Sequence, residues 1–203
     1  MKAIVFGATT LLAAGTLGLY TWSTMQPDTP APCGDTAIAG GAIGGPFELM
    51  SETGETVTET DVITKPTLVY FGYTFCPDVC PLDSARNAQA AYLLADRGYD
   101  VGTVFISVDP DRDTPEVVRD FTDNFHEDML GLTGTPDQVK AASQTYRTYY
   151  RKQEDGDPDY YLVDHSVQTY LMLPNTGMAT FFKREHTPEQ IADITSCFID
   201  RQA

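Results

Sequence analysis

The alternation of apolar and polar segments along the chain predicts a mixed α/β domain. Short, nearly continuous apolar runs indicate strands buried on both faces, whereas apolar positions in a helical rhythm indicate helices. The apolar runs predict strands at residues 67–73, 101–108, 130–132, 160–163, 167–173 and 179–182. The helical rhythm, with capping residues at its start, predicts helices at 82–97, 115–125, 136–151 and 187–198. The first strand, helix and second strand therefore predict a βαβ unit with parallel strands.

A short β-hairpin is predicted ahead of this unit. Residues 46–50 alternate between apolar and polar side chains, residues 51–54 have the composition of a turn, and residues 55–58 form the returning strand. The predicted order is hairpin, βαβ unit, two helices with a brief strand between them, the strands between residues 160 and 182, and a last helix. This order is typical of an α/β, thioredoxin-like sandwich with an N-terminal β-hairpin extension and a helical insert. We expect one such domain at residues 45–203.

The first residues predict a single transmembrane helix before the domain. Residues 3–22 carry no charged side chain and are about as long as a bilayer-spanning helix. Tyr20 and Trp22 stand where interfacial aromatic residues belong, and Lys2 places the N-terminus in the cytoplasm. We therefore expect a membrane anchor at residues 1–24 and a linker at 25–44. A cleaved signal peptide is the alternative, and in both cases the domain is exported.

The acidic balance of the chain limits its partners. The 203 residues carry 29 Asp and Glu against 13 Lys and Arg, a formal net charge of -16. This charge argues against binding to nucleic acid or to an anionic membrane surface.

Two of the four cysteines have no place in a local motif. Cys33 follows the predicted anchor, and Cys197 lies in the last predicted helix. An oxidising compartment permits disulfides, so we expect these two residues to pair and to join the N-terminal segment to the last helix. Two unrelated free thiols are the alternative.

The other two cysteines stand where a strand gives way to a helix. Cys76 and Cys80 are four positions apart, so their sulfur atoms lie about one helical turn from each other and can face the same way. The start of a helix carries partial positive charge and free N–H groups, which favour thiolate over thiol. Such thiolates bind a soft metal ion or exchange disulfides.

His165 decides between these two chemistries. The chain has three histidines, and His126 and His186 are expected on the surface near helix ends. His165 lies beside Asp164 in a predicted short loop between two strands, where it is either a metal ligand or a turn residue bonded to its neighbours. Two thiolates and an imidazole suit Cu(I) first, with Cu(II) or zinc also possible. Zinc favours a fourth ligand.

A redox pair is the alternative to a metal site. Thioredoxin-type oxidoreductases, however, separate their two cysteines by two residues and place a cis-proline opposite them. Here three residues separate Cys76 from Cys80, and residues 163–167 contain no proline.

Four stretches of the chain resemble the Sco/SenC family of copper proteins, in the same order. These stretches are 71–81 (FGYTFCPDVCP), 106–115 (ISVDPDRDTP), 131–136 (GLTGTP) and 161–166 (YLVDHS). The resemblance spans residues 45–198 and implies a thioredoxin-like domain that binds one copper through Cys76, Cys80 and His165. It also implies a single membrane anchor with the domain in the periplasm of a bacterium.

The resemblance implies a role as a copper metallochaperone. The family helps to build the dinuclear copper centre of cytochrome c oxidase subunit II, which makes that subunit and a periplasmic copper donor the expected partners. The alternative is a membrane-anchored thiol–disulfide oxidoreductase that keeps the cysteines of that centre reduced through Cys76 and Cys80.

Two acidic residues beside the ligands have two interpretations each. Asp78 either steers copper or a partner, or caps the helix that begins near Val79 by accepting backbone N–H groups. Asp164 either orients the His165 imidazole or stabilises the turn.

Overall fold

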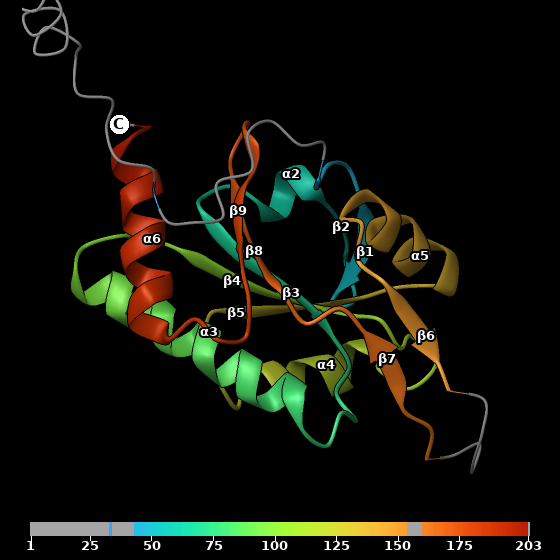
Figure 1. Ribbon diagram of the computed structural model, residues 1–203. Helices are drawn as coiled ribbons and strands as arrows, with labels where there is room; N and C mark the ends of the chain where they lie inside the picture. Colours follow the sequence, from blue (N-terminus) through green and yellow to red (C-terminus); the bar gives the residue numbers. More distant parts are fainter. Residues whose placement is uncertain (1–32, 34–42, 154–159, 203) are drawn as a thin grey trace, which may run out of the picture. The chain divides into compact units, whose positions relative to one another are not determined.

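A seven-stranded mixed sheet forms the centre of the computed structural model, which describes residues 33, 43–153 and 160–202 (Figure 1). The strand order is β2-β1-β5-β4-β3-β8-β9. The strands of this sheet are β1 (Glu48–Ser51), β2 (Thr56–Thr58), β3 (Thr67–Gly72), β4 (Gly102–Ser107), β5 (Met129–Thr133), β8 (Thr169–Leu173) and β9 (Gly177–Phe182). A separate two-stranded ribbon contains β6 (Tyr150–Lys152) and β7 (Val163–His165).

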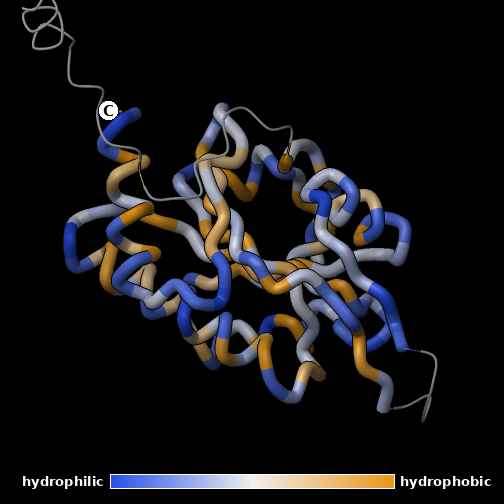
Figure 2. Tube along the Cα trace, viewed as in Figure 1, coloured by the Kyte–Doolittle hydropathy of each residue, from blue (hydrophilic) through white to orange (hydrophobic). Residues whose placement is uncertain are grey.

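Helices cover both faces of the sheet. The helices are α2 (Glu59–Val62), α3 (Val79–Asp96), α4 (Pro115–Thr122), α5 (Pro136–Thr145) and α6 (Pro188–Asp200). Figure 1 shows α3 and α4 on one face and α5 on the other. Every residue of β3 is buried, as the nearly continuous apolar run predicts for a central strand. Figure 2 shows the hydrophobic residues gathered on the central strands.

The pairing of the strands confirms the predicted βαβ unit and the predicted N-terminal hairpin. β3 pairs in parallel with β4, and β4 with β5, whereas β8 and β9 pair antiparallel at the other side of β3. β1 and β2 form the predicted hairpin, with Leu49 opposite Val57. Because β3 and β4 run in the same direction, their carboxyl ends lie at one edge of the sheet, the usual place for a site in open α/β sheets.

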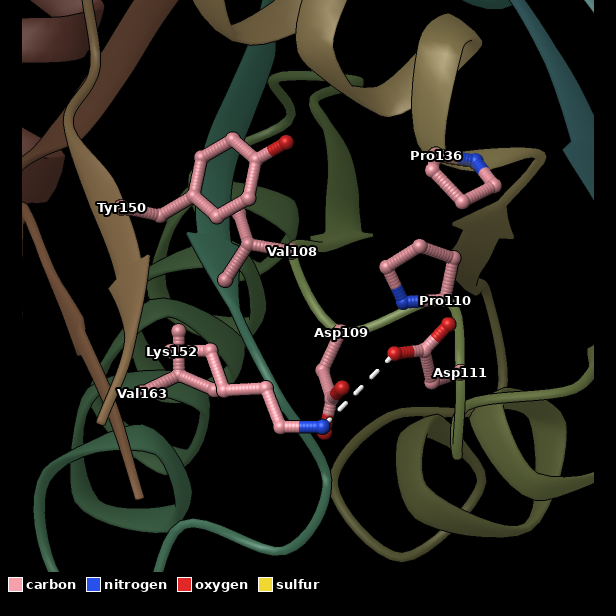
Figure 3. A pocket seen from close by; sticks show the side chains of 8 residues that line it. All are labelled: Val108, Asp109, Pro110, Asp111, Pro136, Tyr150, Lys152 and Val163. Atoms are coloured by element: carbon pink, nitrogen blue, oxygen red, sulfur yellow. Dashed lines mark ion pairs between the residues drawn. The ribbon is translucent and has the colours of Figure 1, made fainter. Parts of the chain in front are cut away.

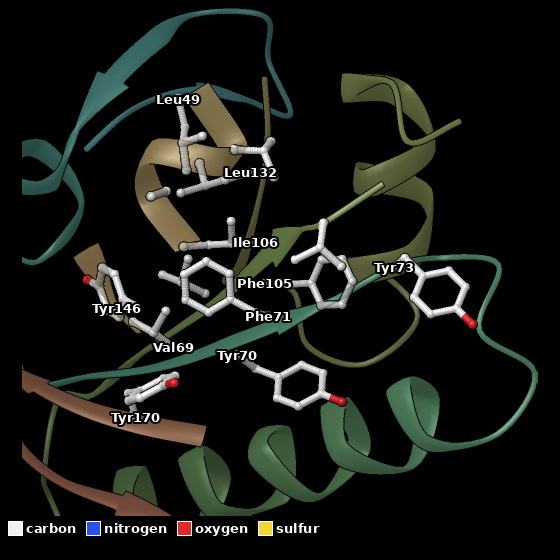
Figure 4. Packing of buried hydrophobic residues seen from close by; sticks show 14 of the residues in the cluster. Leu49, Val69, Tyr70, Phe71, Tyr73, Phe105, Ile106, Leu132, Tyr146 and Tyr170 are labelled. Carbon is white, nitrogen blue, oxygen red and sulfur yellow. The ribbon is translucent and has the colours of Figure 1, made fainter. Parts of the chain in front are cut away.

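Successive residues of β3 face two different parts of the core. Phe71 packs against Tyr146 and Tyr170 on the α5 side, with ring centroids 5.2 and 6.2 Å away (Figure 4). Tyr70 points to the opposite face, where it contacts the ring of Phe105 at a centroid distance of 6.3 Å and extends toward α3. The period-two alternation of a strand therefore places Tyr70 next to the helix that carries Cys80.

The segment between α5 and β7 differs from the prediction. A helix was expected to continue to residue 151, but α5 ends at Thr145 and residues 150–152 form β6. Arg147 has a φ of 50°, a left-handed conformation that cannot continue an α-helix. His165 was expected in a loop, but it is the last residue of β7 and pairs with Tyr150. The tertiary pairing of β6 with β7 thus overrides the local helical pattern.

Two further parts of the prediction concern the chain ends. Cys33 and Cys197 form a disulfide in the structure, with 5.7 Å between their Cα atoms. The predicted anchor at 1–24 and most of the linker at 25–44 lie outside the described residues. Among the helices that the structure describes, none combines the length and apolar character of a membrane span.

Candidate metal centre

Cys76, Cys80 and His165 converge at the carboxyl edge of the sheet. Cys76 lies in the loop after β3, Cys80 is the second residue of α3, and His165 ends β7. Their ligand atoms all lie within 4.8 Å of one another, and both cysteines are free thiols. Among the described residues, these three form the one group of at least three potential ligands that could hold a metal ion. The structure therefore brings together the three residues that the sequence nominated.

The loop before α3 aims both sulfur atoms inward. The Cys76 N–H donates to the carbonyl of Tyr73 at 3.3 Å, which closes a tight turn directly after β3. The Cys80 N–H then donates to the sulfur of Cys76 at 3.4 Å. Asp78 occupies the N-cap position, but its side chain makes no capping hydrogen bond. The capping role predicted for the Asp78 carboxylate is therefore wrong, and the Cys76 sulfur accepts an N–H of the first turn instead.

The environment shifts the pKa values of the two thiols in opposite directions. The hydrogen bond from the Cys80 thiol is the largest cause that holds the pKa of Cys76 far below its ordinary value, and two backbone N–H groups act in the same direction. The same contact with Cys76, together with burial, raises the pKa of Cys80 well above its ordinary value. Without a metal, Cys76 is therefore the thiolate and Cys80 keeps its proton.

The imidazole of His165 is held by a backbone carbonyl. Its Nδ1 atom lies 2.9 Å from the carbonyl oxygen of Ser166, and because a carbonyl only accepts, Nδ1 carries the proton. This leaves the lone pair of Nε2 facing Cys80, whose sulfur is 3.3 Å away. The ring edges also contact Tyr73 and Tyr70, at centroid distances of 5.6 and 6.2 Å. A neutral imidazole fixed in this way is ready to donate Nε2 to a metal ion.

Asp164 faces away from this ring. Its carboxylate accepts hydrogen bonds from Gln153 at 2.7 Å and from Arg151 at 3.3 Å, and these contacts hold its pKa below the ordinary value. Neighbouring residues of a strand point to opposite faces, so Asp164 and His165 cannot share one face of β7. The predicted orienting role of Asp164 is therefore wrong, and its side chain stabilises the β6–β7 ribbon instead.

The other two histidines lie elsewhere. The ring of His126 stacks on Tyr92 with centroids 4.2 Å apart, and its Nδ1 accepts the N–H of Asp128. His186 accepts the N–H of Lys183 before the start of α6. Neither belongs to the cluster, as expected.

A buried aspartate holds the cysteine loop to β4. The Asp113 carboxylate accepts hydrogen bonds from the backbone N–H of Thr74 at 3.0 Å, the hydroxyl of Thr74 at 2.6 Å and the hydroxyl of Ser107 at 2.5 Å. Burial raises the pKa of Asp113, while these three hydrogen bonds oppose the rise. Sequence reasoning missed this role, because turn and cap chemistry also explains the aspartates of residues 109–113.

A second set of contacts surrounds Tyr161. The Tyr161 hydroxyl donates to Asp109 at 2.6 Å, and Arg112 pairs with the other carboxylate oxygen at 2.6 Å. The cationic groups of Arg112 and Lys152 each lie 3.6 Å from the centroid of the Tyr161 ring. These contacts attach the segment before β7 to the end of β4, and so help to position His165.

A pocket of about 130 Å³ adjoins these contacts (Figure 3). Apolar side chains and two aspartates line it, and Lys152 reaches across it to Asp111 at 3.9 Å. Val163, two residues before His165, forms one wall. The pocket therefore lies against the β6–β7 ribbon, and none of the three cluster residues lines it.

The fold and the cluster together define the class of protein, a thioredoxin-like domain with a candidate metal site. A thioredoxin-like α/β domain carries two sulfur donors and one nitrogen donor, a set that favours soft or borderline ions over magnesium or calcium.

Within this class, the chain belongs to the SCO1/SenC family, whose model matches residues 35–200. The protein SenC of Rhodobacter capsulatus is 53% identical over 199 residues, which cover 98% of this chain and 90% of that protein.

Solved structures of the same family share the fold. The crystal structure of Arabidopsis thaliana ScoI with copper bound has a TM-score of 0.75 at 43% identity, covering 80% of this chain and 100% of that one. Yeast Sco1 with copper bound has a TM-score of 0.73 at 34% identity, with coverage of 79% and 90%. BsSco, a member of the Sco family of cytochrome c oxidase assembly proteins, has a TM-score of 0.61 at 22% identity, with coverage of 80% and 95%. At that identity the likeness shows the fold alone.

Proposed function

We propose that this protein is a copper metallochaperone that binds one copper ion through Cys76, Cys80 and His165. The convergence of two sulfur atoms and one imidazole nitrogen within 4.8 Å carries the proposal. Two thiolates and one neutral imidazole match the preferences of Cu(I) and tolerate Cu(II), whereas a closed zinc site favours a fourth ligand. The copper-bound Arabidopsis and yeast relatives support the choice of metal.

The three-ligand arrangement suits transfer rather than permanent storage. Three protein ligands leave copper coordinatively unsaturated, so the thiolates of an acceptor can enter and replace these ligands one at a time. The acceptor we propose is the dinuclear copper centre of cytochrome c oxidase subunit II, with a periplasmic protein as the copper donor. Membership of the SCO1/SenC family supports this assignment.

The location belongs to the same proposal. Residues 1–24 anchor the protein in the bacterial inner membrane, and the domain lies in the periplasm. The uncharged run at residues 3–22 supports the anchor, and the Cys33–Cys197 disulfide supports an oxidising compartment. Extraction of membranes at alkaline pH tests the anchor. Retention of the full-length chain in the membrane pellet is expected, and release into the supernatant would contradict it.

A thiol–disulfide oxidoreductase is the second candidate function. The observation that favours it is the thiolate environment of Cys76, with the thiol of Cys80 beside it. Such a pair can reduce an acceptor disulfide and become oxidised itself. In this case His165 tunes a thiolate but is not required for exchange.

Copper titration of the protein, with Cys76 and Cys80 reduced, separates the two candidates. We expect one Cu(II) per chain with a sulfur-to-copper charge-transfer band, which is lost in Cys76→Ser, Cys80→Ser and His165→Ala. His126→Ala is the matched control and retains the band, because His126 lies outside the cluster. Copper binding that is indifferent to His165, together with full disulfide exchange by His165→Ala, would favour the oxidoreductase.

A further inference from the structure

The hydroxyl of Tyr70 lies between a proposed copper ligand and a buried carboxylate. It is 3.9 Å from the sulfur of Cys80 and 3.1 Å from Oδ2 of Asp83. Tyr70 and Cys80 are almost completely buried, at 2% and 0% exposure, so solvent does not compete for this hydrogen. Figure 4 shows the ring extending from β3 toward α3, the helix that contains Cys80 and Asp83. One hydroxyl hydrogen therefore faces two acceptors.

The negative charge of Asp83 is already matched by two arginines. The Arg86 guanidinium lies 3.1 Å from Oδ1, and Nε of Arg184 lies 3.4 Å from Oδ2. Arg86 is itself fixed, since it also donates to the hydroxyl of Thr169 and to the carbonyl of Lys183. Asp83 therefore does not depend on the tyrosine as its sole hydrogen-bond donor.

The charge and the surroundings of the Cys80 sulfur change when it binds copper. A coordinated thiolate carries negative charge, and its present neighbour, Nε2 of His165 at 3.3 Å, is then occupied by the metal. The Tyr70 hydroxyl lies on this sulfur within the reach of a sulfur hydrogen bond. Groups that contact metal ligands in this way orient them and tune the metal.

We propose that Tyr70 is a positioning residue of the copper site, which donates its hydroxyl hydrogen to the Cys80 thiolate, and that Asp83 holds this hydroxyl in place and competes for its hydrogen. The inference rests on the proposed copper-binding function. A hydrogen bond to a coordinated thiolate lowers the energy of the sulfur lone pair. It therefore raises the energy of sulfur-to-Cu(II) charge transfer and favours Cu(I) over Cu(II).

The test compares Tyr70→Phe with the unmodified protein, both as the full chain with copper bound. Tyr70→Phe retains the ring contacts with His165 and Phe105 and removes only the hydroxyl. We expect the charge-transfer band to move to longer wavelength, the Cu(II)/Cu(I) reduction potential to fall, and the Cu(I) affinity to decrease about tenfold. A merely structural role would change stability but would move neither the band nor the potential.

Tyr146→Phe is the matched control. Tyr146 is a fully buried tyrosine on the other side of the sheet, and its hydroxyl has no hydrogen-bond partner among the described residues. This variant leaves the band and the potential unchanged. If Tyr70→Phe also leaves both unchanged while the unmodified protein binds copper, the inference is overturned and the proposed function stands. If the unmodified protein binds no copper, both are overturned.

Asp83→Asn decides the question if Tyr70→Phe does not fold. A neutral amide oxygen is a weaker acceptor than the carboxylate, so the Tyr70 hydroxyl is freer to donate to Cys80. The band then moves to shorter wavelength, opposite to the change in Tyr70→Phe. An unchanged band, or a move to longer wavelength, would refute the competition between Asp83 and Cys80.

Discussion

Replacement of Asp113 by alanine tests how the cysteine loop is held. The Asp113 carboxylate accepts from the backbone N–H of Thr74, the Thr74 hydroxyl and the Ser107 hydroxyl, and Asp113 has no exposed surface. In Asp113→Ala, these three donors lose their partner in a buried place. Thr74 is two residues before Cys76, so the same change loosens the loop that carries a proposed copper ligand.

The expected loss in the free energy of unfolding follows from counting the donors left without a partner. Each buried polar group without a partner costs about 1 kcal/mol or more, so Asp113→Ala should lower the free energy of unfolding by about 3 kcal/mol. Asp113→Asn should cost less, about 1 kcal/mol. Its amide oxygen can replace Oδ2 and accept from the Thr74 N–H and the Ser107 hydroxyl. Its NH₂ group then replaces Oδ1 and donates to the Thr74 hydroxyl, which can turn to accept.

Urea unfolding of the copper-free protein, with the Cys33–Cys197 disulfide intact, measures both variants. Asp111→Ala is the control, because Asp111 is exposed and its ion pair with Lys152 is long, at 3.9 Å. We expect the free energy of unfolding to change by less than about 0.5 kcal/mol. A loss below about 1 kcal/mol in Asp113→Ala would refute the argument. Equal losses in the alanine and asparagine variants would show that the charge, and not the hydrogen bonds, holds the loop.

Three further predictions concern the packing, the disulfide and the pH dependence. A Cβ at Gly72 would lie 2.9 Å from the rings of Phe105 and Tyr70 and 3.0 Å from the Cys80 sulfur. Gly72→Ala should therefore lower the free energy of unfolding in urea by about 1–3 kcal/mol and weaken copper binding. Unchanged stability and unchanged copper binding would contradict this packing. Replacing Cys33 and Cys197 together by serine opens a loop of 164 residues and should cost about 5 kcal/mol by chain entropy, measured by the same unfolding, while copper stoichiometry stays at one; a loss below about 2 kcal/mol would contradict the chain-entropy argument. Copper must displace the Cys80 proton, since the pKa of Cys80 is raised and that of Cys76 lowered, so the apparent copper affinity measured by competition should rise about tenfold per pH unit near neutrality, and a flat profile would contradict it.

The order of the elements followed closely from local patterns. The apolar run at 67–73 became β3, and the capping box at Thr187 and Gln190 begins α6 as expected. These features depend on residues near one another in sequence, so periodicity and cap chemistry are sufficient to find them. The prediction of a helix to residue 151 was wrong, because residues 150–152 pair as β6 with β7, which lies 13 residues further along the chain.

The sequence by itself determined the ligand types of the site: two cysteines one turn apart at a helix start, and a histidine beside an aspartate. Only the tertiary structure decided that His165 faces Cys80 while Asp164 points away, that the Cys76 sulfur and not Asp78 accepts an N–H of α3, and which buried groups hold the cluster. Tyr70, Asp83 and Asp113 carry no local signal of their own, since a buried tyrosine in a strand and an aspartate in a turn or helix are ordinary residues. Their roles arise from contacts between distant segments, such as the contact between Thr74 and Asp113, which are 39 positions apart. Packing of the sheet against its helices creates those contacts, and periodicity along the chain does not record them.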